Sequence, residues 1–170
     1  MLKVTAMIMI ASAFALGGRW LAAYQSKRVA VINDIILMLS VIETQLRYAC
    51  LPVSELLRVM GENPTVSKLG FIKCVREKVC FGEPFPDAWS SSVENESELC
   101  RLLGTSAQHL IRLGFDIGAT DLEGQLSCCE YYKKLFEKEL ENQEEKSRRY
   151  AKLFPSLGLL AGVSAAILII

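Results

Sequence analysis

The chain has 170 residues, of which 51% are hydrophobic and 22% are charged, with 19 basic and 19 acidic side chains. Zero net charge argues against a nucleic-acid-binding protein, which would carry a strong basic excess, and the charge content excludes a disordered chain. The mean hydropathy of +0.27 is high for a soluble domain. The distribution of the apolar residues therefore decides the class of protein.

Apolar residues concentrate at both ends of the chain. No charge occurs between Val4 and Gly18, the apolar character resumes after Arg19 as far as Tyr24, and residues 153–170 are again uncharged. A bilayer core about 30 Å thick is crossed by about 20 mostly apolar helical residues. We therefore expect transmembrane helices over residues 1–24 and 153–170, with a water-soluble domain over residues 25–152 between them.

Basic residues flank both apolar segments on the side of the central domain. Lys27 and Arg28 follow the first segment, and Lys146, Arg148, Arg149 and Lys152 precede the second. Because loops rich in Lys and Arg stay in the cytoplasm, we expect a multi-pass protein of the cell membrane whose central domain is cytoplasmic.

The N-terminal segment has a second interpretation. Lys3, the apolar run and the small residues from Ala11 to Ala15 also fit a cleaved secretory signal. The alternative is thus an exported helical protein anchored by its C-terminal segment. The six cysteines show no C-x-x-C spacing, which favours buried, reduced thiols in a cytoplasmic domain over disulfides or a zinc site.

The first half of the central domain has helical periodicity. Nothing breaks the chain after Tyr24, so the first membrane helix is expected to run directly into a helix with one buried stripe. Pro52 separates it from a short helix over 53–60, and Asn63-Pro64 predicts a helix start whose helix reaches Phe81. Gly82 is expected as its left-handed C-cap, and a further short helix carries Trp89 as a core residue. The buried stripe comprises Ile32, Ile35, Ile36, Leu39, Ile42 and Leu46.

The second half is also helical. Asn95 and Glu98 predict a capping box before a leucine stripe that Gly114 and Gly118 stop, and Thr120 with Glu123 predicts another box. From there the helical pattern continues to Leu153. The leucine stripe is Leu99, Leu102, Leu103, Ser106, Leu110 and Leu113, and the last helix packs through Leu122, Leu126, Cys129, Phe136 and Leu140.

The last part of that helix is polar on nearly every face, which is typical of a solvated spacer or a partner surface. We predict a protein contact there. The residues of this predicted contact are Glu137, Glu141, Glu144, Glu145, Arg148 and Arg149. In the C-terminal apolar segment, Gly158, Gly162 and Ala166 recur every four residues, a spacing that lets membrane helices pack closely.

The fold class expected from these patterns is all-α: an antiparallel bundle of about five to six helices flanked by two transmembrane helices. No phosphate-binding loop is present. Asp116 and Asp121 are candidates for a pair of carboxylates, but Asp121 fits a helix start. We expect no enzyme activity, no cofactor and no metal; a membrane-bound enzyme that uses His109, the single histidine, is the remaining catalytic alternative.

The order of these features resembles the stage III sporulation protein AB family over essentially the whole chain. The resemblance is carried by Leu39–Leu57 with Glu43 and Pro52, by Ala88-Trp89, by Leu113–Gln125, and by the charged helix ending in Tyr150 before the Leu-Gly-rich C-terminal segment.

This resemblance implies a non-catalytic subunit of a channel between mother cell and forespore, located on the mother-cell side. It also implies a cytoplasmic domain similar to F-type platform proteins of type II secretion. The partners it implies are the lipid bilayer, a secretion-type ATPase of the same complex and other membrane subunits, and no nucleic acid.

Overall fold

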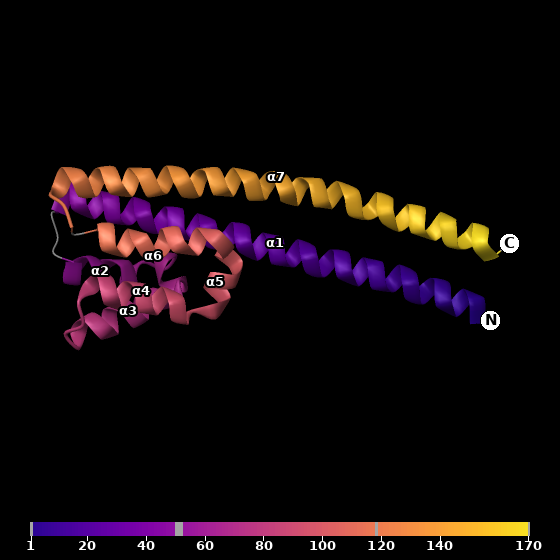
Figure 1. The fold of residues 1–170 in the computed structure, drawn as a ribbon, viewed down its shortest axis with the longest axis horizontal. Coiled ribbons are helices and arrows are strands. Elements are labelled where there is room, and N and C mark those ends of the chain that lie inside the picture. Colours follow the sequence, from indigo (N-terminus) through magenta and orange to yellow (C-terminus); the bar gives the residue numbers. More distant parts are fainter. Residues whose placement is uncertain (1, 50–52, 118, 170) are drawn as a thin grey trace. The chain divides into compact units, whose positions relative to one another are not determined.

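The computed structural model describes the backbone of residues 2–49, 53–117 and 119–169, and the side chains of residues 17–48, 55–117 and 119–149. Within these ranges the chain is all-helical and has no strand, which confirms the predicted all-α class. The elements in chain order are α1 (Leu2–Ala49), α2 (Val53–Glu62), the 3-10 turn η1 (Val66–Lys68), α3 (Gly70–Cys80), α4 (Phe85–Asn95), α5 (Ser97–Leu103), the 3-10 turn η2 (Gly104–Ser106), α6 (Ala107–Asp116) and α7 (Leu122–Ile169) (Figure 1).

The chain divides into two compact units. Residues 30–141 form one unit, which contains the second half of α1, all of α2 to α6 and the beginning of α7. Residues 1–29 and 142–170, the outer parts of the two long helices, form the other. The terminal segments are therefore not separate helices, because each is continuous with a helix of the 30–141 unit.

Helix α1 runs without interruption from Leu2 to Ala49, as the absence of a breaking residue after Tyr24 predicts. Its predicted stripe is confirmed, with Ile36 only partly buried. Met38 lies beside the stripe and is also fully buried, so the apolar face is wider than predicted. The buried side chains of α1 are Ile32, Ile35, Met38, Leu39, Ile42 and Leu46.

One stretch of the described residues, Gly17–Tyr48 in α1, is long and apolar enough by length and composition to cross a membrane. It overlaps the predicted N-terminal span at residues 17–24 and continues into the buried stripe. An N-terminal apolar helix could thus anchor the protein in a membrane. The predicted span over 153–170 lies in the last part of α7, whose side chains are outside the described residues.

The helix predicted from Asn63 to Phe81 is wrong, because the chain breaks at Leu69. Asn63 does cap, since its Oδ1 accepts hydrogen bonds from the amides of Thr65 (3.0 Å) and Val66 (3.3 Å). The element it caps is the short turn η1, after which Leu69 is extended (φ −75°, ψ 96°) and α3 begins.

The Glu96 side chain lies beside this break. A Cβ on Gly70, the first residue of α3, would lie 3.0 Å from Oε1 of Glu96. Burial raises the pKa of this carboxyl, and the backbone amides of Phe71 and Gly70, which have no intrahelical partners, partly oppose that shift. At the other end, Gly82 has φ 92°, which confirms the predicted left-handed residue.

Helix α4 packs against α3 and α6 and carries the centre of the core. The Trp89 ring is 1% exposed, lies edge-on to Phe71 with 5.1 Å between ring centroids, and its Nε1 donates to the Leu110 carbonyl at 2.8 Å. The prediction that Gly114 stops a helix is wrong: α6 continues to Asp116, and Gly114 is buried inside it. A Cβ on Gly114 would lie 2.3 Å from Cδ1 of Trp89, so glycine is needed for close packing.

Both predicted capping boxes need correction. Asn95 ends α4 instead of starting a helix, and α5 begins after Glu96 with no side-chain cap. Before α7, the oxygen that accepts the Gly124 amide (3.0 Å) is Oδ1 of Asp121, not the hydroxyl of Thr120. Asp competes well with Thr at this position, because its side chain is ionised and lies at the positive end of the helix dipole.

The leucine stripe is buried along its whole length, as predicted, although Gly104 (φ 59°) and η2 divide it between α5 and α6. In α7, Cys129 and Phe136 are buried as predicted. The prediction that Leu122 packs against the core is wrong, since 41% of this residue is exposed. The helix also does not end near Leu153 but continues to Ile169.

Candidate interaction surface

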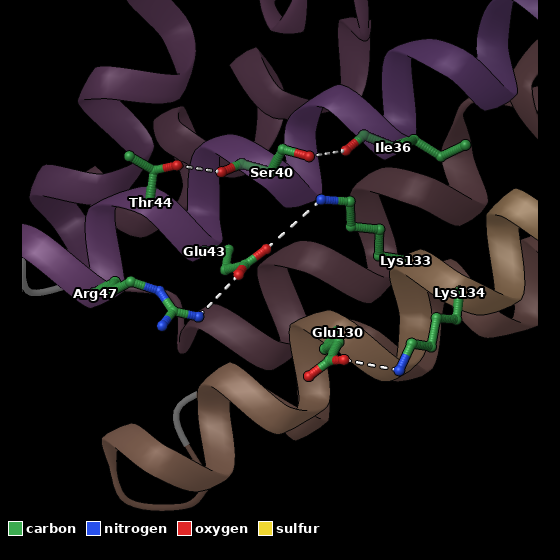
Figure 2. A network of polar contacts seen from close by, with 8 residues as sticks. All are labelled: Ile36, Ser40, Glu43, Thr44, Arg47, Glu130, Lys133 and Lys134. Carbon is green, nitrogen blue, oxygen red and sulfur yellow. Dashed lines mark hydrogen bonds and ion pairs between the residues drawn. The ribbon is translucent and has the colours of Figure 1, made fainter.

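A network of ion pairs joins the end of α1 to the beginning of α7 within the 30–141 unit. One Glu43 carboxylate oxygen lies 3.0 Å from Nη2 of Arg47, one turn further along α1, and the other lies 3.7 Å from Nζ of Lys133 on α7 (Figure 2). The Glu43 and Lys133 side chains are only 26% and 29% exposed. Glu43 therefore connects two helices that are distant in sequence.

A second pair extends this network along α7. Nζ of Lys134 donates to Oε1 of Glu130 at 2.7 Å (Figure 2). This bond lowers the pKa of Glu130, and the charges of Arg47 and Lys133 lower it further. Exposed pairs of this kind within one helix add little to stability, because water screens them. The pair that joins the two helices is the one between Glu43 and Lys133.

The sequence points to only part of this network. Glu43 and Arg47 have opposite charges at a spacing of four, which predicts a pair on one helix. The contact with Lys133 depends on how α1 and α7 pack, and no local pattern contains that information. Lys133 therefore cannot be identified as a partner of Glu43 from the sequence alone.

The predicted contact residues on α7 are all exposed, but they belong to both compact units. Glu137 and Glu141 lie in the 30–141 unit. In the other unit, Arg148 lies 3.8 Å from Glu144 and Arg149 lies 2.6 Å from Glu145, each one turn away. The acidic and basic side chains there pair along the helix and remain accessible.

The predicted membrane-packing residues lie in the last part of α7. Gly158, Gly162 and Ala166 are helical, but their side-chain surroundings lie outside the described residues. Their role in helix packing stays a prediction.

The carboxylates considered for catalysis have structural partners. Asp116 accepts a hydrogen bond from the hydroxyl of Tyr132 (2.6 Å), which joins the end of α6 to α7. Burial, and this bond to a carboxylate, raise the pKa of Tyr132. Asp121 caps α7, and His109 is partly exposed on α6. Among the described residues, no three His, Cys, Asp or Glu side chains are grouped so that they could hold a metal ion.

The cysteines whose side chains are described are free thiols in different environments. Cys74 and Cys80 are exposed on α3, whereas Cys129 is 1% exposed and its burial raises the thiol pKa to about 12. Burial also raises the pKa of Cys128, and the charge of Asp116 adds to the effect. Because the thiolate is the reactive form, the vicinal pair is far less reactive than the exposed cysteines.

The fold and this surface define an all-helical protein with an apolar N-terminal helix and exposed charged faces on its helices. The chain belongs to the stage III sporulation protein AB family, whose family model matches residues 3–170. It is therefore a sporulation-related protein, as its sequence features led us to expect. No curated protein and no solved structure gives a significant match to the chain.

Proposed function

We propose that the chain is a non-catalytic platform subunit of a secretion-like channel between mother cell and forespore. Its helical domain, residues 25–152, would lie at the cytoplasmic face of the membrane and connect a secretion-type ATPase to other membrane subunits. The observation that carries the proposal is the family match over residues 3–170, together with an apolar helix that continues into the core of the 30–141 unit.

The absence of enzymatic activity is part of this proposal. Two carboxylates that could act in proton transfer have structural roles instead: Asp116 accepts the Tyr132 hydroxyl, and Asp121 caps α7. His109 lies on α6, and no cluster of potential metal ligands accompanies it in the described part of the chain. These roles support a scaffold, because a catalytic acid or base must be available to a substrate.

The charged surface of α7 is the proposed contact with the ATPase. A pulldown of that ATPase by the full chain in detergent would test it. The test variant reverses the charges of all the predicted contact residues: Glu137, Glu141, Glu144, Glu145, Arg148 and Arg149. Reversing both members of each ion pair keeps the pairs along the helix while inverting the charge pattern that a partner meets.

The matched control reverses Lys73 and Glu77, which are exposed on α3. We expect the α7 variant to lose the ATPase and the α3 variant to retain it. Equal capture by both variants would refute the proposed contact surface.

Topology is tested separately by thiol labelling of the full chain in cells. Cys80 is the appropriate reporter, since it is exposed, whereas Cys128 is partly buried with a raised pKa. We expect an impermeant maleimide to label Cys80 only after permeabilisation. Labelling of intact cells would instead support the exported alternative, and N-terminal sequencing would then locate a cleaved signal.

A further inference from the structure

The outer face of α1 within the 30–141 unit carries an uncharged strip formed by Leu37, Val41, Thr44 and Tyr48. Leu37 is 48% exposed and Tyr48 is 81% exposed, although both are large and apolar. Thr44 is also exposed, whereas Val41 is half-buried against the core. The exposed face of α7 in the same unit is mostly charged, as at Glu130. We call these four positions the α1 strip.

The hydroxyl groups on this side of α1 are bonded to the helix itself. Oγ of Ser40 donates to the Ile36 carbonyl at 3.0 Å, and Oγ1 of Thr44 donates to the Ser40 carbonyl at 2.7 Å (Figure 2). Such bonds to the carbonyl four residues earlier use the hydroxyl proton inside the helix. The strip therefore presents mainly methyl, isobutyl and aromatic groups.

The nearest charged side chains are directed to one side of the strip. Arg47 and Lys133 both point toward the Glu43 carboxylate (Figure 2), at 3.0 Å and 3.7 Å. Since this network connects α1 to α7, it holds the charges over the junction of the two helices. A partner can thus cover the strip without removing an ion from water.

The four positions follow the spacing 4-3-4, which is the a/d pattern of a coiled-coil seam. A partner for an uncharged seam must present an uncharged helical face. The other exposed large apolar residues described in the 30–141 unit form no such seam: Phe81 and Phe115 are isolated, and Leu122 and Tyr131 are nine residues apart on α7, on opposite faces of the helix. Among the described residues of this unit, the surface that matches the strip is the same strip on another molecule.

We propose that the α1 strip is a homodimerisation seam, on which a second copy of this chain packs with its α1 parallel to the first. The parallel sense rests on the proposed membrane anchoring, because two α1 helices that enter one membrane in the same direction cannot be antiparallel. Asp34 occupies the preceding seam position and would face its own copy, so the seam begins at Leu37. From Leu37 to Tyr48 it extends about 16 Å at 1.5 Å per residue. An interface this short needs the high local concentration that a shared membrane supplies.

Disulfide crosslinking of the full chain in membranes tests the seam. The background replaces Cys50, Cys74 and Cys80 with serine, and single variants then introduce a thiol by Leu37→Cys or Thr44→Cys. The matched control is Ser127→Cys, at an exposed position of α7. We expect same-residue dimers at both strip positions, several-fold above the control, since paired d positions lie within disulfide reach in a parallel seam.

Two outcomes would overturn the proposal. One is crosslinking at Leu37 and Thr44 no stronger than at Ser127. The other is stronger crosslinking when Leu37→Cys and Tyr48→Cys chains are mixed than within either variant alone, because that indicates antiparallel helices. Leu37→Lys is expected to weaken crosslinking at Thr44 several-fold while the helical circular-dichroism signal stays unchanged, because Leu37 is outside the core.

Membrane fractionation separates this inference from the proposed function. A protein that is in the membrane fraction but gives no strip-specific dimers refutes the seam and leaves the platform role in place. A protein outside the membrane fraction that still forms these dimers supports the seam and refutes the anchoring.

Discussion

Replacing Gly114 with alanine should destabilise the domain, although the same change in most helices is favourable. The added Cβ would lie 2.3 Å from Cδ1, 2.4 Å from Cγ and 2.8 Å from Cβ of Trp89. These atoms are at the root of the side chain, so they cannot move without displacing the whole ring. The ring is held by the Leu110 carbonyl through a 2.8 Å hydrogen bond and by the edge of Phe71.

Three effects determine the size of this change. Alanine is better than glycine inside a helix by about 1 kcal/mol. Overpacking a filled core costs about 1–3 kcal/mol, and displacing the ring from Leu110 would leave the buried Nε1–H of Trp89 unpaired, at about 1–3 kcal/mol. The free energy of unfolding should therefore fall by about 1–5 kcal/mol in Gly114→Ala.

Urea unfolding of the full chain in detergent measures this difference. Trp89 is the reporter in a Trp20→Phe background, since the chain has two tryptophans. Gly61→Ala is the matched control, because its Cβ would meet only the flexible end of Arg76 at 3.2 Å. The control should be as stable as the parent or slightly more. A Gly114→Ala midpoint equal to the parent, with unchanged Trp89 emission, would refute the packing explanation.

Three further predictions concern Glu96, Tyr132 and the cysteines. Burial raises the pKa of Glu96 above its ordinary value. Its contribution to stability is therefore present at low pH and is lost as the pH rises through the raised pKa. Glu96→Gln should be at least as stable at pH 7 and should lack this loss of stability as the pH rises above the ordinary carboxyl range; a steeper loss in the variant would contradict this. Tyr132→Phe should lose about 1 kcal/mol with its bond to Asp116, and in the parent the phenol should ionise only above about pH 10, as an absorbance titration would show. Cys80 should react with maleimide at once, whereas Cys129, with its pKa of about 12, should react only on unfolding; peptide mapping that finds both labelled in the native protein would contradict its burial.

The buried faces of the long helices were predictable because the hydrophobic pattern is strong and local. The stripe from Ile32 to Leu46 and the leucines from Leu99 to Leu113 repeat at the helical period, and each forms part of one core cluster. Exposed Leu122 shows the limit of this reasoning: the pattern places it on the packed face, but it lies at the first residue of α7, where little core remains to cover it.

The positions where helices break or end were less predictable, because tertiary contacts decide them. The break at Leu69 lies beside Glu96, a residue distant in sequence, whose Oε1 would lie 3.0 Å from a Cβ on Gly70. Gly114 looked like a helix stop because glycine often ends helices, but its role depends on Trp89 across the interface. The same limit applies to the candidate surface, where the pairing of Glu43 with Lys133 follows from helix packing alone.

The contact between Glu43 and Lys133 also has a consequence for the order in which the domain is made. Elements α2 to α6 contact neighbours that are close in sequence, so they can assemble soon after they leave the ribosome. The stripe of α1 is synthesised first, yet α7, which supplies Cys129, Tyr132 and Phe136 to the same core cluster, is synthesised last. The core around α1 is therefore incomplete until synthesis is nearly finished, and insertion into a membrane can precede closure of the domain.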